Sequence, residues 1–208
     1  MTEPSPACDH CDHCDHIALL TADLDPLIET LSAAGLPVGP VEEFPGEGTK
    51  EVYVGEPDAS AKLLLLAPAG EGGPYARALE KRGPGIHHLA FVAKSPTEFL
   101  AQNPGWLLHP QSLELYRTTK TLWAARPGVG TLLEISEGER RYGSPALVES
   151  LSLPCTDAEL AGRLLSSLAG GTITAAAESG TGTKGTITIR GRTWRIQPEG
   201  DRLGLIEE

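Results

Sequence analysis

Residues 80–91 read EKRGPGIHHLAF, and the rest of the chain can be ordered around this stretch. It leads into an apolar run, IHHLAFVA (86–93), which predicts a buried strand with His88 near its start. A second such run, HIALLTA (16–22), begins with His16, 72 residues upstream of His88. Leu64 and Glu134, each in the last apolar strand of its own half, are 70 residues apart. Two offsets that agree this closely indicate an internal duplication.

Each half has the same expected order of elements, which is strand, helix, strand and strand, with room for one more strand in the first half. The first helix follows Asp23 or Asp25 as N-cap, has Pro26 early and stops at Gly35. The second helix has Ser95 as cap and Pro96 at its first position. The remaining strands are expected at residues 50–56, 61–68, 119–126 and 130–136.

A weaker third copy is expected at residues 146–208, again in strand–helix–strand order, with Ser150 where the other copies have His16 and His88. The sequence therefore predicts an α+β fold with paired βαβββ modules at 15–137, a degenerate third module at 146–208 and a flexible tail at 1–14. A lone module exposes a sheet face or edge. We therefore expect it to pair with its own copy in a homodimer.

Composition limits the classes of partner. The chain is 40% hydrophobic, which is enough for a core, and its formal charge of −11 argues against nucleic acid and anionic membranes. No run approaches the roughly 18 apolar residues of a membrane span, and no secretory signal is recognised. The four cysteines form no disulfide framework, so we expect a cytoplasmic protein with reduced thiols. A small anionic substrate remains possible, with Lys81 and Arg82 either meeting it or forming a solvated charge run.

The tail carries the unit Cys-Asp-His three times in CDHCDHCDHIALL (8–20). No second Cys/His pair follows at the spacing of a zinc finger, and a three-residue period converges no ligands in a helix or strand. We interpret the repeat as a tail expansion in which only His16, which enters the strand, binds metal.

The pieces DHIALL, LLLLAP, ALEKRGPGIHHLAF and GTLLEIS together resemble the vicinal oxygen chelate superfamily, with methylmalonyl-CoA epimerase and glyoxalase I as the nearest relatives. The resemblance covers roughly residues 14–137. It implies paired βαβββ modules that form a cleft, with one divalent metal ion held by the first and last strands of each module.

Carried over residue by residue, the resemblance implies metal ligands at His16, His88 and Glu134. The fourth position falls on Leu64, which cannot bind a metal. Strand alternation places His87 on the face opposite His88. Two imidazoles and a carboxylate bind Co, Mn, Zn or Fe and leave positions open for substrate.

An epimerase also needs two proton carriers, and the resemblance points to Glu51 in FPGEGTKEVYV (44–54), with Glu134 as the second. The expected function is metal-dependent proton abstraction from a carbon acid, as in an epimerase, isomerase or glyoxalase-like lyase, and an acyl-CoA such as methylmalonyl-CoA is one candidate substrate. Two alternatives stay open because of Leu64. One is a mononuclear Fe(II) dioxygenase of the ring-cleaving type, and the other is a non-catalytic small-molecule-binding protein.

Overall fold

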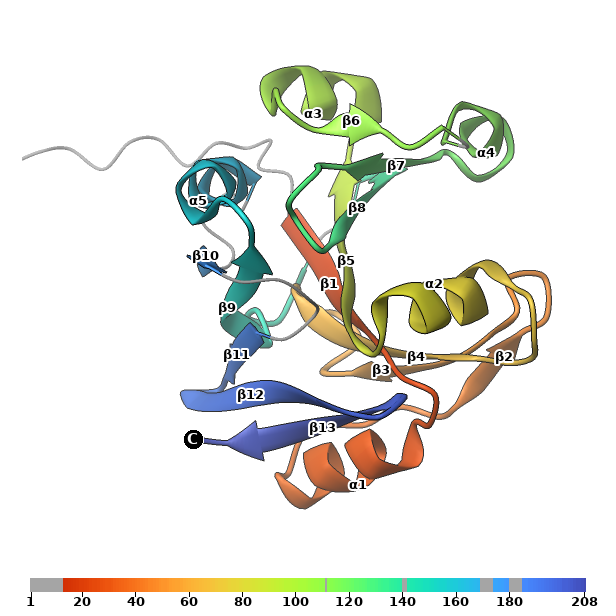
Figure 1. Cartoon of the computed structure of the whole chain (residues 1–208), viewed down its shortest axis with the longest axis vertical. Coiled ribbons are helices and arrows are strands. Elements are labelled where there is room, and N and C mark those ends of the chain that lie inside the picture. The colour runs from red at the N-terminus through yellow and green to blue at the C-terminus, as the bar shows by residue number, and fades with distance from the viewer. Residues whose placement is uncertain (1–12, 111, 140–141, 169–173, 180–184) are drawn as a thin grey trace, which may run out of the picture.

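The structure is a computed structural model that describes residues 13–110, 112–139, 142–168, 174–179 and 185–208 (Figure 1). Its larger sheet has eight strands in the order β2-β3-β4-β1-β5-β8-β7-β6. Residues 1–12 of the predicted tail lie outside the described residues. Its last two residues, His13 and Cys14, belong to the first strand instead.

Two modules build this sheet, and the predicted strand, helix, strand and strand occur in that order in both, with one further short strand in each and one further helix in the second. The first consists of β1 (His13–Leu20), α1 (Asp25–Ala33), β2 (Glu42–Phe44), β3 (Thr49–Val54) and β4 (Lys62–Pro68). The second consists of β5 (Gly85–Ala93), α3 (Pro96–Gln102), β6 (Leu107–Leu108), α4 (Ser112–Thr119), β7 (Thr121–Ala125) and β8 (Leu132–Glu137). In each module the first strand pairs in parallel with the last, and β1 joins β5 in antiparallel fashion at the centre. The predicted α+β class with paired βαβββ modules is confirmed.

Two helices were not predicted. One is α2 (Pro74–Arg82), which connects the modules, and the other is α4, which leads into β7. The cap predicted for α3 is present, since the Ser95 hydroxyl accepts a hydrogen bond from the Glu98 amide at 3.3 Å. For α1 the N-cap is Leu24, without a side-chain cap, and Asp23 instead accepts from the Asp25 amide.

The two faces of the large sheet have different environments. Alternate residues of β1 and β4 point to opposite sides, so Ile17, Leu19, Leu63 and Leu65 join the main core. Ala18, Leu20, Leu64 and Leu66 form a smaller cluster on the other side, which Tyr75, Ala78 and Leu79 of α2 cover. We call the side with the smaller cluster the inner face, and it carries the candidate site.

The C-terminal unit forms a second sheet of five strands in the order β10-β9-β11-β12-β13. It comprises β9 (Val148–Cys155), α5 (Ala158–Leu168), β10 (Thr174–Ser179), β11 (Gly185–Ile189), β12 (Arg192–Glu199) and β13 (Arg202–Glu207). Its first strand pairs in parallel with β10, the strand directly after the helix, and not with the last strand as in the modules. The predicted degenerate βαβββ-like module is therefore not confirmed.

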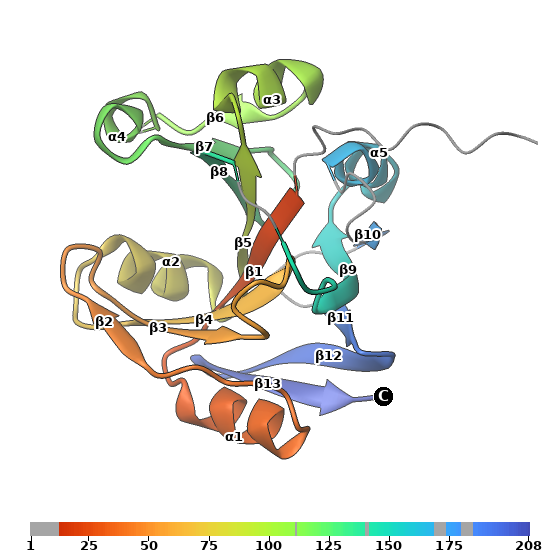
Figure 2. The same cartoon turned by 180° about the vertical axis from the view of Figure 1, so that it is seen from behind.

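This second sheet packs against the outer face of the large sheet, and Figures 1 and 2 show it beside β1, β5 and α1. Its apolar side chains, including Leu151, Ile187 and Trp194, belong to the same continuous core as Ile17 and Leu89. A Cβ built on Gly185 would lie 3.5 Å from Ile86 Cδ1, which shows how closely the two sheets approach. The sheet face on which the homodimer prediction rested is thus covered within one chain, and that reason for a dimer was wrong.

Candidate metal centre

Three side chains that are distant in sequence converge on the inner face. His16 Nε2 lies 3.2 Å from His88 Nε2, and His88 Nε2 lies 3.2 Å from Glu134 Oε2. One ligand atom from each of the three residues falls within 4.8 Å of the others. His16 and His88 are buried, while the Glu134 side chain keeps 21% of its surface exposed. The three residues predicted to bind metal are therefore brought together.

The strand register explains this convergence. His16 on β1 is aligned with Ala90 on β5, and Ala90 is aligned with Glu134 on β8. All three lie in one row across the sheet, and the small Ala90 side chain leaves room between the two functional groups.

A second row has the same form and contains His88. Ala18 on β1 is aligned with His88 on one side and with Leu64 on the other. Leu64 thus occupies the position in the first module that Glu134 occupies in the second, as the 70-residue offset predicted. It is buried in the inner cluster and offers no ligand atom.

An aromatic side chain stands beside each central histidine. Tyr53, aligned with Leu64, meets the His16 ring edge to face with centroids 5.6 Å apart. Trp123, aligned with Glu134, meets the His88 ring in the same manner at 5.0 Å. The duplication therefore extends to the walls of the site, which the sequence pattern alone did not reveal.

Each central histidine follows a bulge. The β1–β5 register skips Asp15 on β1 and His87 on β5. A bulge turns the extra residue out of strict alternation. Asp15 Oδ2 lies 2.8 Å from His16 Nδ1, and His87 Nδ1 lies 2.8 Å from His88 Nδ1. The prediction that His87 points to the opposite face was wrong, because regular alternation fails at the bulge.

Burial and neighbouring charges set the protonation of the site. Burial lowers the pKa of His88, against the raising effect of its hydrogen bond with Glu134, and burial together with His88 holds the pKa of His87 well below its ordinary range. Burial would raise the pKa of Glu134, but its hydrogen bond with His88 and the charges of His88 and His16 outweigh this and lower it. The imidazoles of His87 and His88 therefore resist protonation beside an ionised Glu134 carboxylate.

These groups fit a divalent cation. The Asp15 carboxylate can only accept, so it selects the His16 tautomer with a proton on Nδ1 and a lone pair on Nε2. Two nitrogen ligands each about 2.0–2.1 Å from one tetrahedral metal would be about 3.3–3.4 Å apart. The observed separation of the two Nε2 atoms is 3.2 Å.

Glu51, the predicted base, faces the same site from β3. Its Oε1 accepts a hydrogen bond of 2.7 Å from the Thr49 hydroxyl. Burial raises the Glu51 pKa, and the charges of Glu47 and Glu134 add to this. The Thr49 hydrogen bond and the His16 charge act in the opposite direction. Glu47, which the sequence reasoning missed, has a pKa raised by burial and by Glu134. Its place in the turn before β3 follows no strand period that could have identified it.

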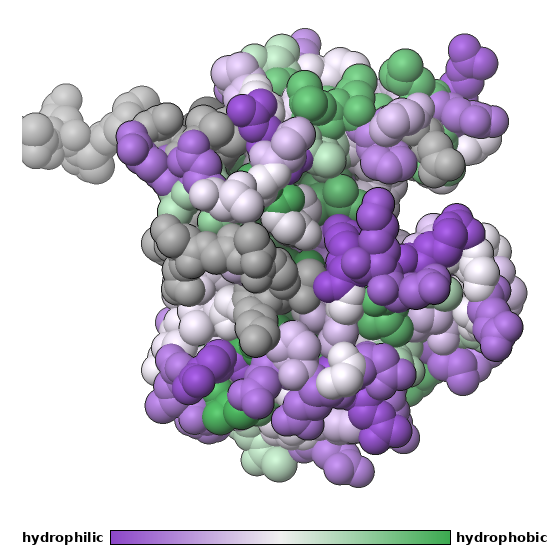
Figure 3. All heavy atoms as spheres, in the orientation of Figure 1, coloured by the Kyte–Doolittle hydropathy of each residue, from purple (hydrophilic) through white to green (hydrophobic). Residues whose placement is uncertain are grey.

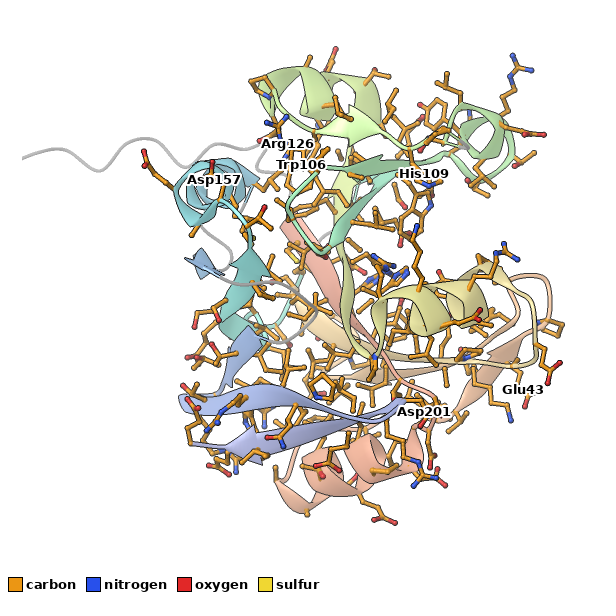
Figure 4. All side chains as sticks on the ribbon, viewed as in Figure 1. Glu43, Trp106, His109, Arg126, Asp157 and Asp201 are labelled. Carbon is orange, nitrogen blue, oxygen red and sulfur yellow. The ribbon has the colours of Figure 1, made fainter. Side chains whose placement is uncertain are left out.

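Further groups border the site from α2. The Tyr75 ring lies 5.1 Å from the His87 ring, and burial followed by the charges of Glu134, Glu47 and Glu51 raises the Tyr75 pKa. The Arg82 charge reaches both His87 and His88 and disfavours their protonation. Figure 3 shows the surface hollowed between the lobe that carries α4 and the ridge of α2, and Figure 4 places His109 on the α4 side of this hollow.

Cys14, the one repeat cysteine that the structure describes, points away from the site. It is fully buried in the main core, and its thiol lies 3.7 Å from the His16 carbonyl oxygen, to which it donates. Burial and the Asp15 charge raise its pKa, so it stays a thiol. The repeat residues before His13, which include Cys8, His10 and Cys11, lie outside the described residues.

Comparison with known proteins gives matches among solved structures alone, since no protein-family model and no curated protein matches the chain. A methylmalonyl-CoA epimerase from Mycobacterium tuberculosis is 24% identical, with 62% of this chain and 89% of that chain covered and a TM-score of 0.44. A hypothetical protein from Bacillus halodurans C-125 is 24% identical, with 64% and 99% covered and a TM-score of 0.46. A methylmalonyl-CoA epimerase in complex with methylmalonyl-CoA and NH4+ is 22% identical, with 63% and 99% covered and a TM-score of 0.44.

Among the described residues, no helix is long and apolar enough to cross a membrane. The strand pairing of this chain itself carries the fold class, with two βαβββ modules around the candidate metal centre of His16, His88 and Glu134.

Proposed function

We propose that this chain is a divalent-metal-dependent enzyme that removes a proton from a carbon acid and stabilises the resulting enolate, as an epimerase, isomerase or glyoxalase-like lyase. The observation that carries the proposal is the convergence of His16, His88 and Glu134, with Glu51 aligned with Leu66 of the inner face and close enough for the charges of His16 and Glu134 to shift its pKa. Co, Mn, Zn and Fe all suit two imidazoles and a carboxylate. The bound cation would stabilise the negative charge that proton loss leaves on substrate oxygens.

The residues of the chain supply the proton transfer. Burial raises the Glu51 pKa, which suits a general base, and the Thr49 hydroxyl holds its carboxylate in place. Glu134 comes from the other module. Two carboxylates from different modules can approach a substrate carbon from different sides, as inversion of a stereocentre requires.

The substrate class follows from the charges around the site. Arg82 lies near enough to affect His87 and His88, so it can receive an anionic group, while the Trp123 and Tyr75 rings form apolar walls. We therefore propose a small anionic substrate, and methylmalonyl-CoA is the first acyl-CoA to test.

The test is solvent deuterium exchange. The cobalt-loaded protein is incubated with methylmalonyl-CoA in D2O, and deuterium at the α-carbon is followed by mass spectrometry. We expect incorporation by the unchanged protein, a loss of at least about 100-fold in Glu51→Gln, and full activity in Glu43→Gln, whose carboxylate pairs with Lys50 on the surface. Exchange by the unchanged protein that persists in Glu51→Gln would remove Glu51 as the base.

Leu64 favours one second candidate. A site with two histidines, one carboxylate and no fourth protein ligand is also typical of mononuclear Fe(II) oxygenases. Iron in the purified protein together with oxygen uptake on a catechol, and no exchange on acyl-CoA, would support that reading. Tight binding of a catechol or an acyl-CoA with neither exchange nor oxygen uptake would support the non-catalytic binding protein.

A further inference from the structure

Asp15 is a buried carboxylate whose two oxygens contact different partners. It is 4% exposed, and Oδ2 lies 2.8 Å from His16 Nδ1. Oδ1 accepts a hydrogen bond of 3.1 Å from the Tyr142 hydroxyl and lies 3.5 Å from Lys62 Nζ. The carboxylate is therefore held on one side while it holds the metal-site histidine on the other.

Lys62 is an unusual partner, because it is only 3% exposed. Its ammonium donates to the Ala59 carbonyl at 3.0 Å and stands 5.8 Å from the Tyr53 ring and 5.9 Å from the Tyr142 ring. Burying an ion pair gives little net stability compared with apolar residues of the same size. The Lys62–Asp15 pair therefore points to a role other than stability, and the contact of Asp15 with His16 provides one.

Tyr142 belongs to the connection between the modules and the C-terminal unit, and this connection is fixed along the turn before β4. Ser144 pairs with Ala59 as an isolated bridge and donates through its hydroxyl to Asp58 at 2.7 Å. The Leu147 amide donates to the Ser60 carbonyl at 3.0 Å. The contacts along residues 142–147 thus place the Tyr142 hydroxyl against Asp15.

We propose that Asp15 is a positioning residue for the metal ligand His16, and that Lys62 and Tyr142 hold Asp15 in place, so that the connection to the C-terminal unit contributes to metal affinity. This inference rests on the metal site of the proposed function. A carboxylate that accepts the Nδ1 proton fixes the ring orientation, leaves the lone pair on Nε2 and makes that nitrogen a stronger donor.

Asp15→Asn distinguishes positioning from packing, because it keeps the size of the side chain. If the amide oxygen faces His16, the amide NH2 points at the Lys62 ammonium, which can only donate, and at the Tyr142 hydroxyl, which must then accept instead of donate. If the amide is reversed, its NH2 faces His16 Nδ1 and selects the tautomer with a proton on Nε2, which cannot bind metal. Both orientations weaken the site.

The experiment measures the dissociation constant for Co²⁺ by competition with a chelator, together with the visible spectrum of the bound cobalt. We expect affinity about 10- to 100-fold lower in Asp15→Asn, with an altered spectrum. Tyr142→Phe removes only a hydroxyl and should weaken binding several-fold. Tyr116→Phe is the matched control, since it removes a hydroxyl that donates to Glu137 on the surface, and it should bind as the unchanged protein does.

Tyr142→Phe keeps the test valid if Asp15→Asn does not fold. Cobalt affinity within twofold of the unchanged protein in the folded variants would overturn the inference and leave the proposed function in place. Weak binding in Asp15→Asn with normal binding in Tyr142→Phe would remove the role of Tyr142. A failure of the unchanged protein to bind cobalt would remove the proposed function and this inference with it.

Discussion

Asp15 and His87 occupy equivalent positions in the two modules, although one is a carboxylate and the other an imidazole. Each is the bulged residue directly before a central histidine, and each places a polar atom 2.8 Å from Nδ1 of that histidine. The two modules therefore share the geometry of this contact and differ in the chemical group that makes it. Nδ1 of His16 contacts the Asp15 carboxylate. Nδ1 of His88 instead contacts the His87 imidazole, whose pKa burial holds well below its ordinary range.

The stability of the metal-free protein should therefore depend on pH. Burial lowers the folded-state pKa of both His87 and His88 below 6.5, so the unfolded chain takes up protons there while the folded chain does not. The free energy of unfolding should fall as the pH drops below about 6.5, by up to about 1.4 kcal/mol per pH unit for each histidine. The lowered pKa of Glu134 adds a contribution that is present above 4.5 and is lost at more acidic pH.

Urea unfolding at pH 8, 6 and 5 in the presence of EDTA measures this dependence. His87→Gln keeps a polar side chain but removes one titrating group, so its stability should change less steeply between pH 6 and pH 5. If the free energy of unfolding changes equally steeply with pH in both proteins, His87 does not remain neutral in the folded state over this pH range.

The metal content of the purified protein should be about one divalent ion per chain, because three ligand atoms converge at one point. His88→Ala removes the ligand nearest to both others and should abolish it, whereas a chain lacking residues 1–12 should retain it. Elemental mass spectrometry measures the metal content of the unchanged protein and of both variants. Metal that is lost with the tail but kept in His88→Ala would place the site in the Cys-Asp-His repeat.

Some of this site could be predicted from the sequence, and the reason is its repetition. The offsets of 72 and 70 residues identified His16, His88, Leu64 and Glu134 as equivalent pairs, and the strand register aligns them so. Asp15 and His87 could not be assigned, because a bulge is a property of two paired strands and regular alternation puts such residues on the wrong face. The C-terminal pairing was missed for a similar reason: strand order along the chain does not specify which neighbour a strand selects.

Leu64→Gln should restore a ligand at the fourth position. Leu64 is in the row that contains Ala18 and His88, so an amide oxygen there faces the site that Glu134 faces from the other side. We expect tighter cobalt binding, together with a metal-free protein destabilised by about 1–3 kcal/mol, since the buried amide then lacks a partner.

Leu66→Gln is the control for this change. It lies on the same strand and the same inner cluster, two residues further along. It should cost similar stability in the metal-free protein and give no gain in cobalt affinity. The two constants come from chelator competition and the stabilities from urea unfolding. A gain in both variants, or in neither, would argue against Leu64 as the equivalent of Glu134.

The C-terminal sheet should unfold together with the two modules, because both share one core. Ile187 on β11 is fully buried in that core, whereas Ile206 on β13 is 41% exposed. Ile187→Ala should lower the free energy of unfolding by about 2–4 kcal/mol, while Ile206→Ala should change it by less than about 1 kcal/mol. Far-ultraviolet circular dichroism and tryptophan fluorescence, to which Trp123 beside the metal site and Trp194 on β12 both contribute, should report one coincident transition in urea. Two separated transitions, of which Ile187→Ala shifts only one, would show that the modules are stable without the second sheet covering their outer face.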